Sequence, residues 1–151
     1  MAQYFFDTSA FVKYDHTEPG TPTVSAIFAE RGSKRRISSL GLLETQAAFG
    51  MKVRASVLDK ASAGLQRARL MLDIAAGDVE VYGVGEDHFV AAERLIGRHS
   101  FMRRLRTLDA LQLAVALDLH NQGLLDSFVV ADLPLAEAGA LEGLRVINPE
   151  P

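Results

Sequence analysis

Four acidic residues stand where a folded protein normally places an apolar residue or a helix cap. Asp7 ends the apolar segment YFFD, and Asp132 ends FVVAD in the same way. Glu44 lies four residues after Leu40 in SSLGLLETQAAFG, so one helical turn brings both side chains to one face. Asp109 falls in the first turn of LDALQLAVAL, which is apolar on both faces. These acids are the first candidates for chemistry.

The residues around Glu44 predict an amphipathic helix. Apolar side chains recur there at helical spacing: Leu40, Leu43, Ala47, Ala48 and Met51. We expect this stripe to be the buried face, where a carboxylate is out of place.

Each acid also has an ordinary structural explanation. Asp7 and Asp132 could cap the helices after them, an effect worth about 0.5–2 kcal/mol. Asp109 could complement a helix dipole, worth about 0.3–1 kcal/mol. Glu44 could reach solvent past its neighbours, as acidic side chains usually do.

Taken together, the four acids indicate a metal site. In an open α/β sheet, ligands bind beyond the carboxyl ends of the strands. Two of the acids end strands and two lie near the starts of helices, so all four can face one crevice. Their repulsion there must be relieved by protons or by a cation. Oxygen ligands without cysteine or a suitably placed histidine select Mg²⁺ or Mn²⁺, which suits phosphoryl chemistry.

The elements that position the acids predict an α/β fold with a mostly parallel sheet. The expected strands are residues 3–6, a brief one near Ile37, 79–84, 128–131 and 144–147. The expected helices are residues 8–14, 21–31, 39–55, 60–76, 87–98, 107–121 and 134–140, with 32–36 as a basic loop. Since no repeat or linker interrupts this order, we expect residues 1–151 to form a single domain.

Composition excludes several classes of protein. The chain has 151 residues, 48% of them hydrophobic and none of them cysteine, which argues against disorder, disulfides and thiolate metal sites. No apolar run approaches the ~20 residues of a membrane span, and the N-terminus lacks the pattern of a signal peptide. We therefore expect a cytoplasmic protein without membrane contact.

Basic residues are concentrated in two short runs. The net charge of −3 means that any nucleic-acid site must be local. One run is residues 34–36; the other joins Arg98 and His99 to Arg103, Arg104 and Arg106, just before Asp109. Either run could bind RNA phosphates or be an ordinary solvated face, and proximity to Asp109 favours substrate or partner contact for the second. The four histidines share no spacing and are expected to be surface or capping residues.

The segments that contain the four acids, taken in their order along the chain, resemble those of the PIN domain. The resemblance is greatest to the VapC-type toxins of bacterial and archaeal toxin–antitoxin pairs. YFFDTSAFVKY followed by EPG is similar to the family's opening strand with its first acid, Asp7. SSLGLLETQAAF is similar to the segment with its glutamate, Glu44. LRTLDALQLAVAL and FVVADLPLAEAGALEGLRVINP resemble the later segments with Asp109 and Asp132. Together these segments cover nearly the whole chain.

Three further positions bear on the resemblance. Ser9 matches a hydroxyl residue that the family has near its metal. Gln112 stands where many relatives have histidine, and Val130 where threonine is common. Neither departure removes a carboxylate.

The resemblance implies a three-layer α/β/α fold and a metal-dependent endoribonuclease that hydrolyses RNA phosphodiester bonds. The four acids would be catalytic residues that hold Mg²⁺ or Mn²⁺, with Ser9 near the metal. The position of Arg104 and Arg106 just before Asp109, rather than the resemblance, makes them candidates for substrate contact. It also implies a homodimer and a cognate antitoxin whose C-terminal segment blocks the site.

Three alternatives remain open. The chain could be an RNA-processing PIN nuclease outside toxin–antitoxin systems, or a catalytically idle PIN module that binds RNA or protein. A phosphatase with Asp7 as nucleophile is the third, but enzymes of the haloacid dehalogenase type have a second aspartate where this chain has Ser9.

Overall fold

The central strand of the fold is buried on both sides. In a strand, successive side chains point to opposite faces. Phe5 and Phe6 accordingly belong to two different apolar clusters, and both are fully buried. A strand that is apolar on both faces requires a layer of helices on each, which predicts the three-layer arrangement.

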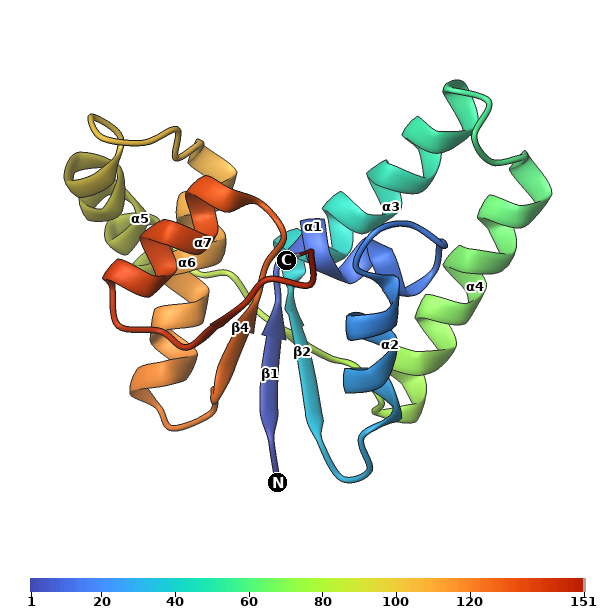
Figure 1. Ribbon diagram of the computed structural model, residues 1–151, viewed down its shortest axis with the longest axis horizontal. Coiled ribbons are helices and arrows are strands. Elements are labelled where there is room, and N and C mark those ends of the chain that lie inside the picture. Colours follow the sequence, from blue (N-terminus) through green and yellow to red (C-terminus); the bar gives the residue numbers. More distant parts are fainter. Residues whose placement is uncertain (151) are drawn as a thin grey trace.

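The computed structural model describes residues 1–150 and contains a five-stranded, all-parallel sheet in the order β3-β2-β1-β4-β5 (Figure 1). The strands are β1 (Gln3–Phe6), β2 (Lys34–Ser38), β3 (Glu80–Tyr82), β4 (Ser127–Val129) and β5 (Val146–Ile147). The helices are α1 (Thr8–Phe11), the 3₁₀ helix η1 (Val12–Tyr14), α2 (Thr21–Ala29), α3 (Ser39–Arg54), α4 (Lys60–Ala76), α5 (Glu86–His99), α6 (Thr107–Asn121) and α7 (Leu133–Leu141). The predicted α/β class with a parallel sheet is confirmed.

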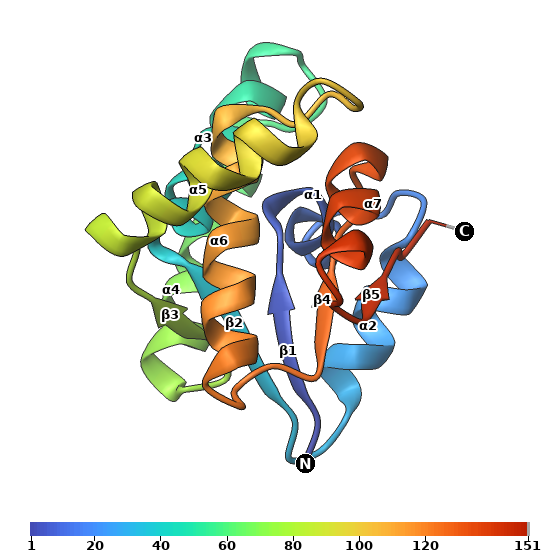
Figure 2. The ribbon, with the colours of Figure 1, turned by 90° about the vertical axis from the view of Figure 1, so that its left-hand side faces the viewer.

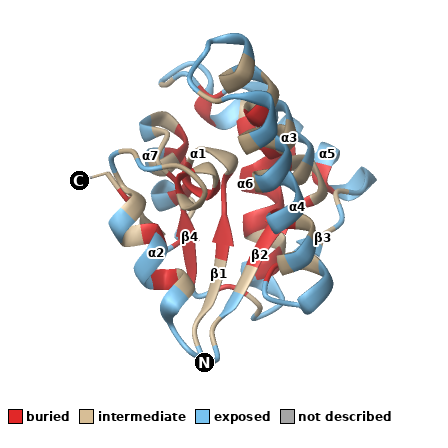
Figure 3. Ribbon diagram, turned by 90° about the vertical axis from the view of Figure 1, so that its right-hand side faces the viewer, coloured by how far each residue is buried: buried red, intermediate tan, exposed pale blue. Residues whose placement is uncertain are grey.

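Helices cover the sheet in two groups (Figures 1 and 2). Helices α5, α6 and α7 pack on one face, around Phe5 and Phe128, whose rings stack 5.7 Å apart. The other face is covered by α1 and α2 with parts of α3 and α4, around Phe6 and Phe11. Burial is greatest in β1, β4, the end of β2 and α6 (Figure 3). Within residues 1–150, no helix is long and apolar enough to cross a membrane.

The basic run at residues 34–36 is a strand rather than the expected loop. These residues open β2, and β2 pairs with β3 so that Arg36 lies opposite Glu80. The Glu80 carboxylate lies 2.8 Å from Nε of Arg36 and 2.9 Å from Nζ of Lys34. Since Lys34 is in register with Gln3 at the beginning of β1, the run lies at the opposite end of the sheet from Asp7. Its role is structural.

The expected burial of the apolar stripe on α3 is wrong. Leu43 and Met51 are 66% and 58% exposed, and the buried residues of α3 are Gly41, Thr45 and Phe49. Gly41 and Thr45 allow close helix packing although they are not part of the apolar pattern. The periodicity therefore identified a real apolar face of α3, but the rest of the protein packs most closely on a different face. Leu43, Ala47 and Met51 face outward, while Leu40 and Ala48 are half-buried.

Candidate active site

Two of the four acids meet because their strands are neighbours. Asp7 follows β1 and Asp132 lies three residues beyond β4. The strands pair with Phe6 opposite Val129, and the Asp7 amide donates to the Val129 carbonyl at 2.9 Å. From here the chain continues from β1 towards β2 on one side and from β4 towards β5 on the other. Such a reversal is where open α/β sheets place their ligands.

The hydroxyl of Ser9 joins the two strand ends. It donates to Oδ2 of Asp7, 2.5 Å away, and accepts from the amides of Ala131 and Asp132 at 3.1 and 3.3 Å. The Ser9 amide also donates to Oδ2 of Asp7, at 3.0 Å. One donor and two acceptor positions of the hydroxyl are thereby used. Ser9 therefore fixes the position of Asp7 relative to the backbone at Asp132.

Asp7 is the most perturbed acid of the site. It is only 5% exposed, and burial raises the pKa of its carboxyl from 3.8 to about 6. The hydrogen bonds from Ser9 oppose that rise, while the negative charges of Glu44 and Asp109 add to it. Asp7, Glu44 and Asp109 therefore share one electrostatic environment, although they come from three different elements.

Glu44 is held by two polar side chains that the sequence reasoning did not single out as site residues. Its Oε1 accepts from Oγ1 of Thr8 at 3.0 Å and from Nε2 of Gln112 at 3.1 Å. Oε1 of Gln112 accepts in turn from Ser38 at 2.7 Å. Gln112 is 1% exposed. The signal in the sequence was the amide of Gln112 within the apolar segment LDALQLAVAL, because a buried amide requires hydrogen-bond partners.

Arg106 connects the remaining two acids. It directly precedes α6, and its Nε donates to Oδ2 of Asp109 at 2.9 Å, while its backbone amide reaches the same oxygen at 3.2 Å. Its Nη2 lies 3.7 Å from Oδ2 of Asp132. These acids, with a smaller effect from Asp7, raise the pKa of the guanidinium. Arg106 is thus a positive charge supplied by the chain itself.

Three of the acids also cap helices, as was the ordinary explanation for Asp7 and Asp132. Asp7 caps α1, and Asp132 caps α7 by accepting from the Leu135 amide at 3.1 Å. Asp109 caps the start of α6 with its partner Arg106. Capping and metal binding are compatible, because a carboxylate that accepts from an amide keeps further lone pairs.

The donor chemistry of the site fits a hard divalent cation, since the four acids offer only carboxylate oxygens. In the arrangement seen over residues 1–150, however, no three acids or histidines converge closely enough to hold an ion. Asp109 and Asp132 are turned instead toward Arg106. A cavity of about 330 Å³ is lined by Glu44, Arg106, Thr107, Leu108 and Asp109. The remaining basic candidate, Arg104, is exposed in the loop before α6.

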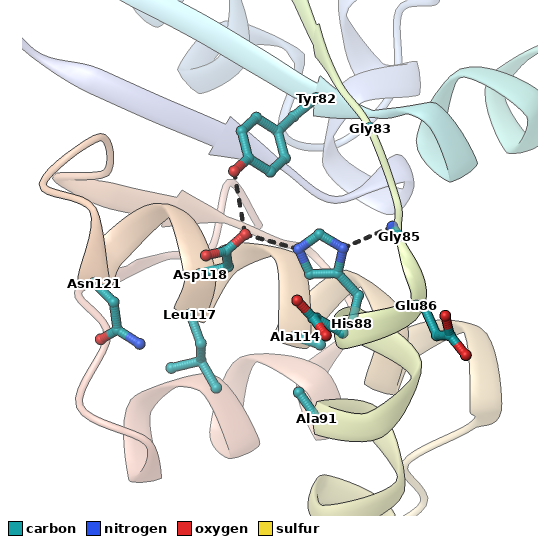
Figure 4. Close-up of a pocket in the computed structure, with 11 residues that line it drawn as sticks. Tyr82, Gly83, Gly85, Glu86, His88, Ala91, Ala114, Leu117, Asp118 and Asn121 are labelled. Carbon is teal, nitrogen blue, oxygen red and sulfur yellow. Dashed lines mark hydrogen bonds and ion pairs between the residues drawn. The ribbon is translucent and has the colours of Figure 1, made fainter.

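A larger pocket, of about 690 Å³, lies away from the acids between β3, α5 and α6 (Figure 4). There Nε2 of His88 lies 2.8 Å from Asp118, and Nδ1 accepts from the Gly85 amide at 2.9 Å. Tyr82 and Gln122 also donate to Asp118. Because both ring nitrogens are engaged, His88 caps α5 and ties it to α6 rather than serving as a base. The capping role expected for histidine is confirmed here.

Comparison with known proteins is consistent with this fold. The family model described as "PIN domain" matches residues 4–128. VapC20 of Mycobacterium tuberculosis, a sarcin-ricin loop cleaving toxin, superposes with a TM-score of 0.67 at 22% identity, covering 90% of this chain and 95% of that one. VapBC2 of Rickettsia felis, bound to a promoter DNA fragment, gives 0.66 at 15% identity over 96% and 97%. FitAcB of Neisseria gonorrhoeae gives 0.65 at 16% over 97% of both chains. No curated protein sequence matches the chain.

Proposed function

The chain belongs to the PIN domain family, and from this premise we propose that it is a Mg²⁺- or Mn²⁺-dependent endoribonuclease that acts as the toxin of a toxin–antitoxin pair. The main support is Asp7. This carboxylate is buried at the reversal point of a parallel sheet, with its pKa raised by burial and by the charges of Glu44 and Asp109. Such perturbation is typical of catalytic groups.

Asp7, Glu44, Asp109 and Asp132 would hold the cation, directly or through water. When bound, the cation would polarise a phosphate oxygen and lower the pKa of an attacking water. Ionisation of Asp7 would then cost less, since a positive charge replaces the repulsion from its neighbours. Ser9 would keep Asp7 in place, while Thr8 and Gln112 would orient Glu44.

Arg106 would bind carboxylates in the metal-free protein and a phosphate of the RNA once the cation is bound. Its guanidinium balances Asp109 and Asp132 in the structure. Once a cation takes over that role, Arg106 would be released to bind a phosphate of the RNA, with Arg104 beside it. Guanidinium groups are well suited to phosphate because their donors match its oxygens in pairs.

The partners of the protein are part of the proposal. The solved structures that it resembles include toxin–antitoxin complexes, two of them bound to DNA. We propose by analogy that this chain forms a homodimer and binds an antitoxin whose C-terminal segment covers the acids. Growth arrest on expression, relieved by a small adjacent gene, would separate a toxin from an RNA-processing nuclease.

The test of the nuclease assignment is Asp7→Ala. We expect this variant to lose RNA cleavage in Mg²⁺ or Mn²⁺ while keeping its fold, as judged by circular dichroism. Asp59→Ala is the matched control, because Asp59 also caps a helix and accepts a hydrogen bond from a serine, Ser62, but it directly precedes α4 and belongs to none of the segments that carry the four acids. Cleavage at the wild-type rate by Asp7→Ala would refute the assignment.

Binding of Mn²⁺ separates the nuclease from an idle PIN module. Calorimetry should detect Mn²⁺ binding to the wild-type protein at or below millimolar concentration, and Asp7→Ala should weaken it. A wild-type protein that binds RNA but no Mn²⁺ would favour the idle module.

A further inference from the structure

The loop between α5 and α6, which leads to Arg106, exposes two large apolar side chains. Phe101 is 90% exposed and Met102 is 79% exposed. Five residues further along, Arg106 contacts Asp109 and Asp132, and five residues span at most about 17 Å. The loop lies at the end of the molecule toward which the strands point (Figures 1 and 2).

The exposure of Phe101 is not a consequence of a loosely held loop. The amides of Met102 and Arg103 both donate to the carbonyl of His99, and Nη1 of Arg103 lies 2.7 Å from Nδ1 of His99. Since a guanidinium only donates, Nδ1 must accept, and Nε2 of His99 donates to Glu142 at 2.6 Å. Leu105, on the other side of the loop, is buried. The fold presents the Phe101 ring on a braced turn.

The segment of the sequence around Phe101 is rich in basic residues. From residue 98 to residue 108 the chain has no acid, yet it has Arg98, His99, Arg103, Arg104 and Arg106, in a protein of net charge −3. Arg98, Arg103 and Arg106 are paired with acids, and His99 shares Glu142 with Arg98. Arg104, in contrast, is exposed and makes no ion pair with any residue from 1 to 150. Arg104, three residues from Phe101, is therefore available to bind a phosphate of a polyanion.

We infer that Phe101 is a stacking platform for an unpaired base of the RNA substrate, near the phosphate that the acids would cleave. The inference rests on the proposed function, and it narrows the substrate to RNA that is single-stranded at this point. A solvent-exposed aromatic ring among arginines is the combination that binds single strands: the arginines follow the backbone, and the ring accepts the face of any base. A protein partner would use the same ring without requiring the basic surroundings.

The chain contains no tryptophan, so Phe101→Trp introduces a unique fluorescent reporter at the proposed contact. The measurement uses the full-length protein in an Asp7→Asn background, to prevent cleavage, and a single-stranded oligoadenylate as probe. We expect the fluorescence to be quenched as the RNA binds. Leu72→Trp, in the same background, is the control, because Leu72 is 69% exposed on α4, and it should not respond.

Affinity provides the second readout. We expect Phe101→Leu to weaken oligoadenylate binding roughly 5- to 150-fold, the loss typical of one stacked base, and Phe101→Tyr to retain it. Because the side chain is exposed, the melting temperature of Phe101→Leu should match that of the Asp7→Asn parent.

The remaining outcomes would overturn the inference. If the wild-type protein cleaves RNA but Phe101→Leu binds it as tightly as its parent and Phe101→Trp is not quenched, the stacking role is wrong and the nuclease stands. If Phe101→Leu instead changes the sedimentation of the protein alone, the ring is a protein contact. If the wild-type protein neither binds nor cleaves RNA, the proposed function fails as well.

Discussion

At the scale of single residues, the site shows a conflict between stability and function. Asp7 caps α1 but is 5% exposed and lies near two other acids. Its charged form is therefore unfavourable in the folded protein unless a cation is present. Arg106 relieves the same repulsion for Asp109 and Asp132. The ion pairs of Arg106 therefore reduce the repulsion among the acids in the metal-free protein.

The raised pKa of Asp7 predicts a stability change with pH. The folded protein binds the proton of the Asp7 carboxyl more tightly than the unfolded chain does. The stability that the protonated Asp7 provides is therefore complete below about pH 4, and it declines as the pH rises from about 4 to about 6. The rise from 3.8 to about 6 corresponds to about 3 kcal/mol. In EDTA, Asp7→Asn should therefore be more stable than the wild type by about 1–3 kcal/mol at pH 7.5.

Urea unfolding at pH 7.5 and pH 4 measures this difference, which should disappear at the lower pH. Burial also raises the pKa of Asp15 to about 6, but this residue is present in both proteins and its effect cancels. Equal stability at pH 7.5 would show that Asp7 is not destabilising when ionised.

Arg106 should compete with the metal. Arg106→Gln removes the positive charge that Asp109 and Asp132 share, and an exposed ion pair is worth about 1 kcal/mol at most. We therefore expect the affinity for Mn²⁺, measured by calorimetry, to rise up to roughly fivefold. Arg94→Gln, an exposed arginine on α5, makes the same change in net charge and should have little effect. An unchanged or weaker affinity in Arg106→Gln would contradict the competition.

At the scale of elements, the site depends on how closely α3 approaches its neighbours. A Cβ added at Gly41 would lie 3.3 Å from Nε2 of Gln112, 3.4 Å from Oγ of Ser38 and 3.6 Å from Oγ1 of Thr8. Gln112 and Thr8 are the groups that hold Glu44. The glycine therefore sets the fit between α3, α1 and α6 at the carboxylate.

Gly41→Ala should reduce cleavage more than stability. Alanine improves helix propensity by about 0.5–1 kcal/mol, which offsets part of the steric strain, but Gln112 has to move by a few tenths of an ångström. We expect the cleavage rate to fall about tenfold, since misplacement of a catalytic group is costly. Gly64→Ala, on α4 with nothing within 4 Å of the added Cβ, should stabilise the protein and leave cleavage unchanged. A wild-type rate in Gly41→Ala would mean that the Gln112–Glu44 contact is not needed.

At the scale of the whole molecule, the apolar stripe of α3 is available for a partner. Leu43 is 66% exposed, Phe89 on α5 is 58% exposed, and both line a shallow pocket of about 230 Å³ with Leu40, Val84 and Leu111. Exposed apolar residues that gather at one place mark interaction surfaces more often than isolated ones do. We expect this face to be the interface of the proposed homodimer.

Leu43→Glu tests the dimer. A charge at the centre of an apolar interface is left without water or a partner, so the variant should sediment as a monomer at concentrations where the wild type is a dimer. Leu65→Glu on α4, whose side chain is 73% exposed, is the matched control and should sediment like the wild type. A Leu43→Glu variant with the wild-type mass would move the interface elsewhere.

Except at residues 34–36, the sequence alone determined which segments are helices and strands and where their acids stand, because these depend on local periodicity and on the polar residues that end each element. The bounds of α4 and α6 agree with the predicted ones, and Asp7 ends β1 as expected. Periodicity also identified the apolar face of α3. It carries no information about what covers a face, because that is set by residues distant in sequence.

The tertiary structure decided the rest. It turned most of the α3 stripe outward, paired Arg36 with Glu80, and brought Gln112 to Glu44 across 68 positions of the chain. It also placed Arg106 between Asp109 and Asp132. Hydrogen bonds and ion pairs act over a few ångströms, so only the packing of the elements determines which charges meet and which are left to bind a metal or RNA.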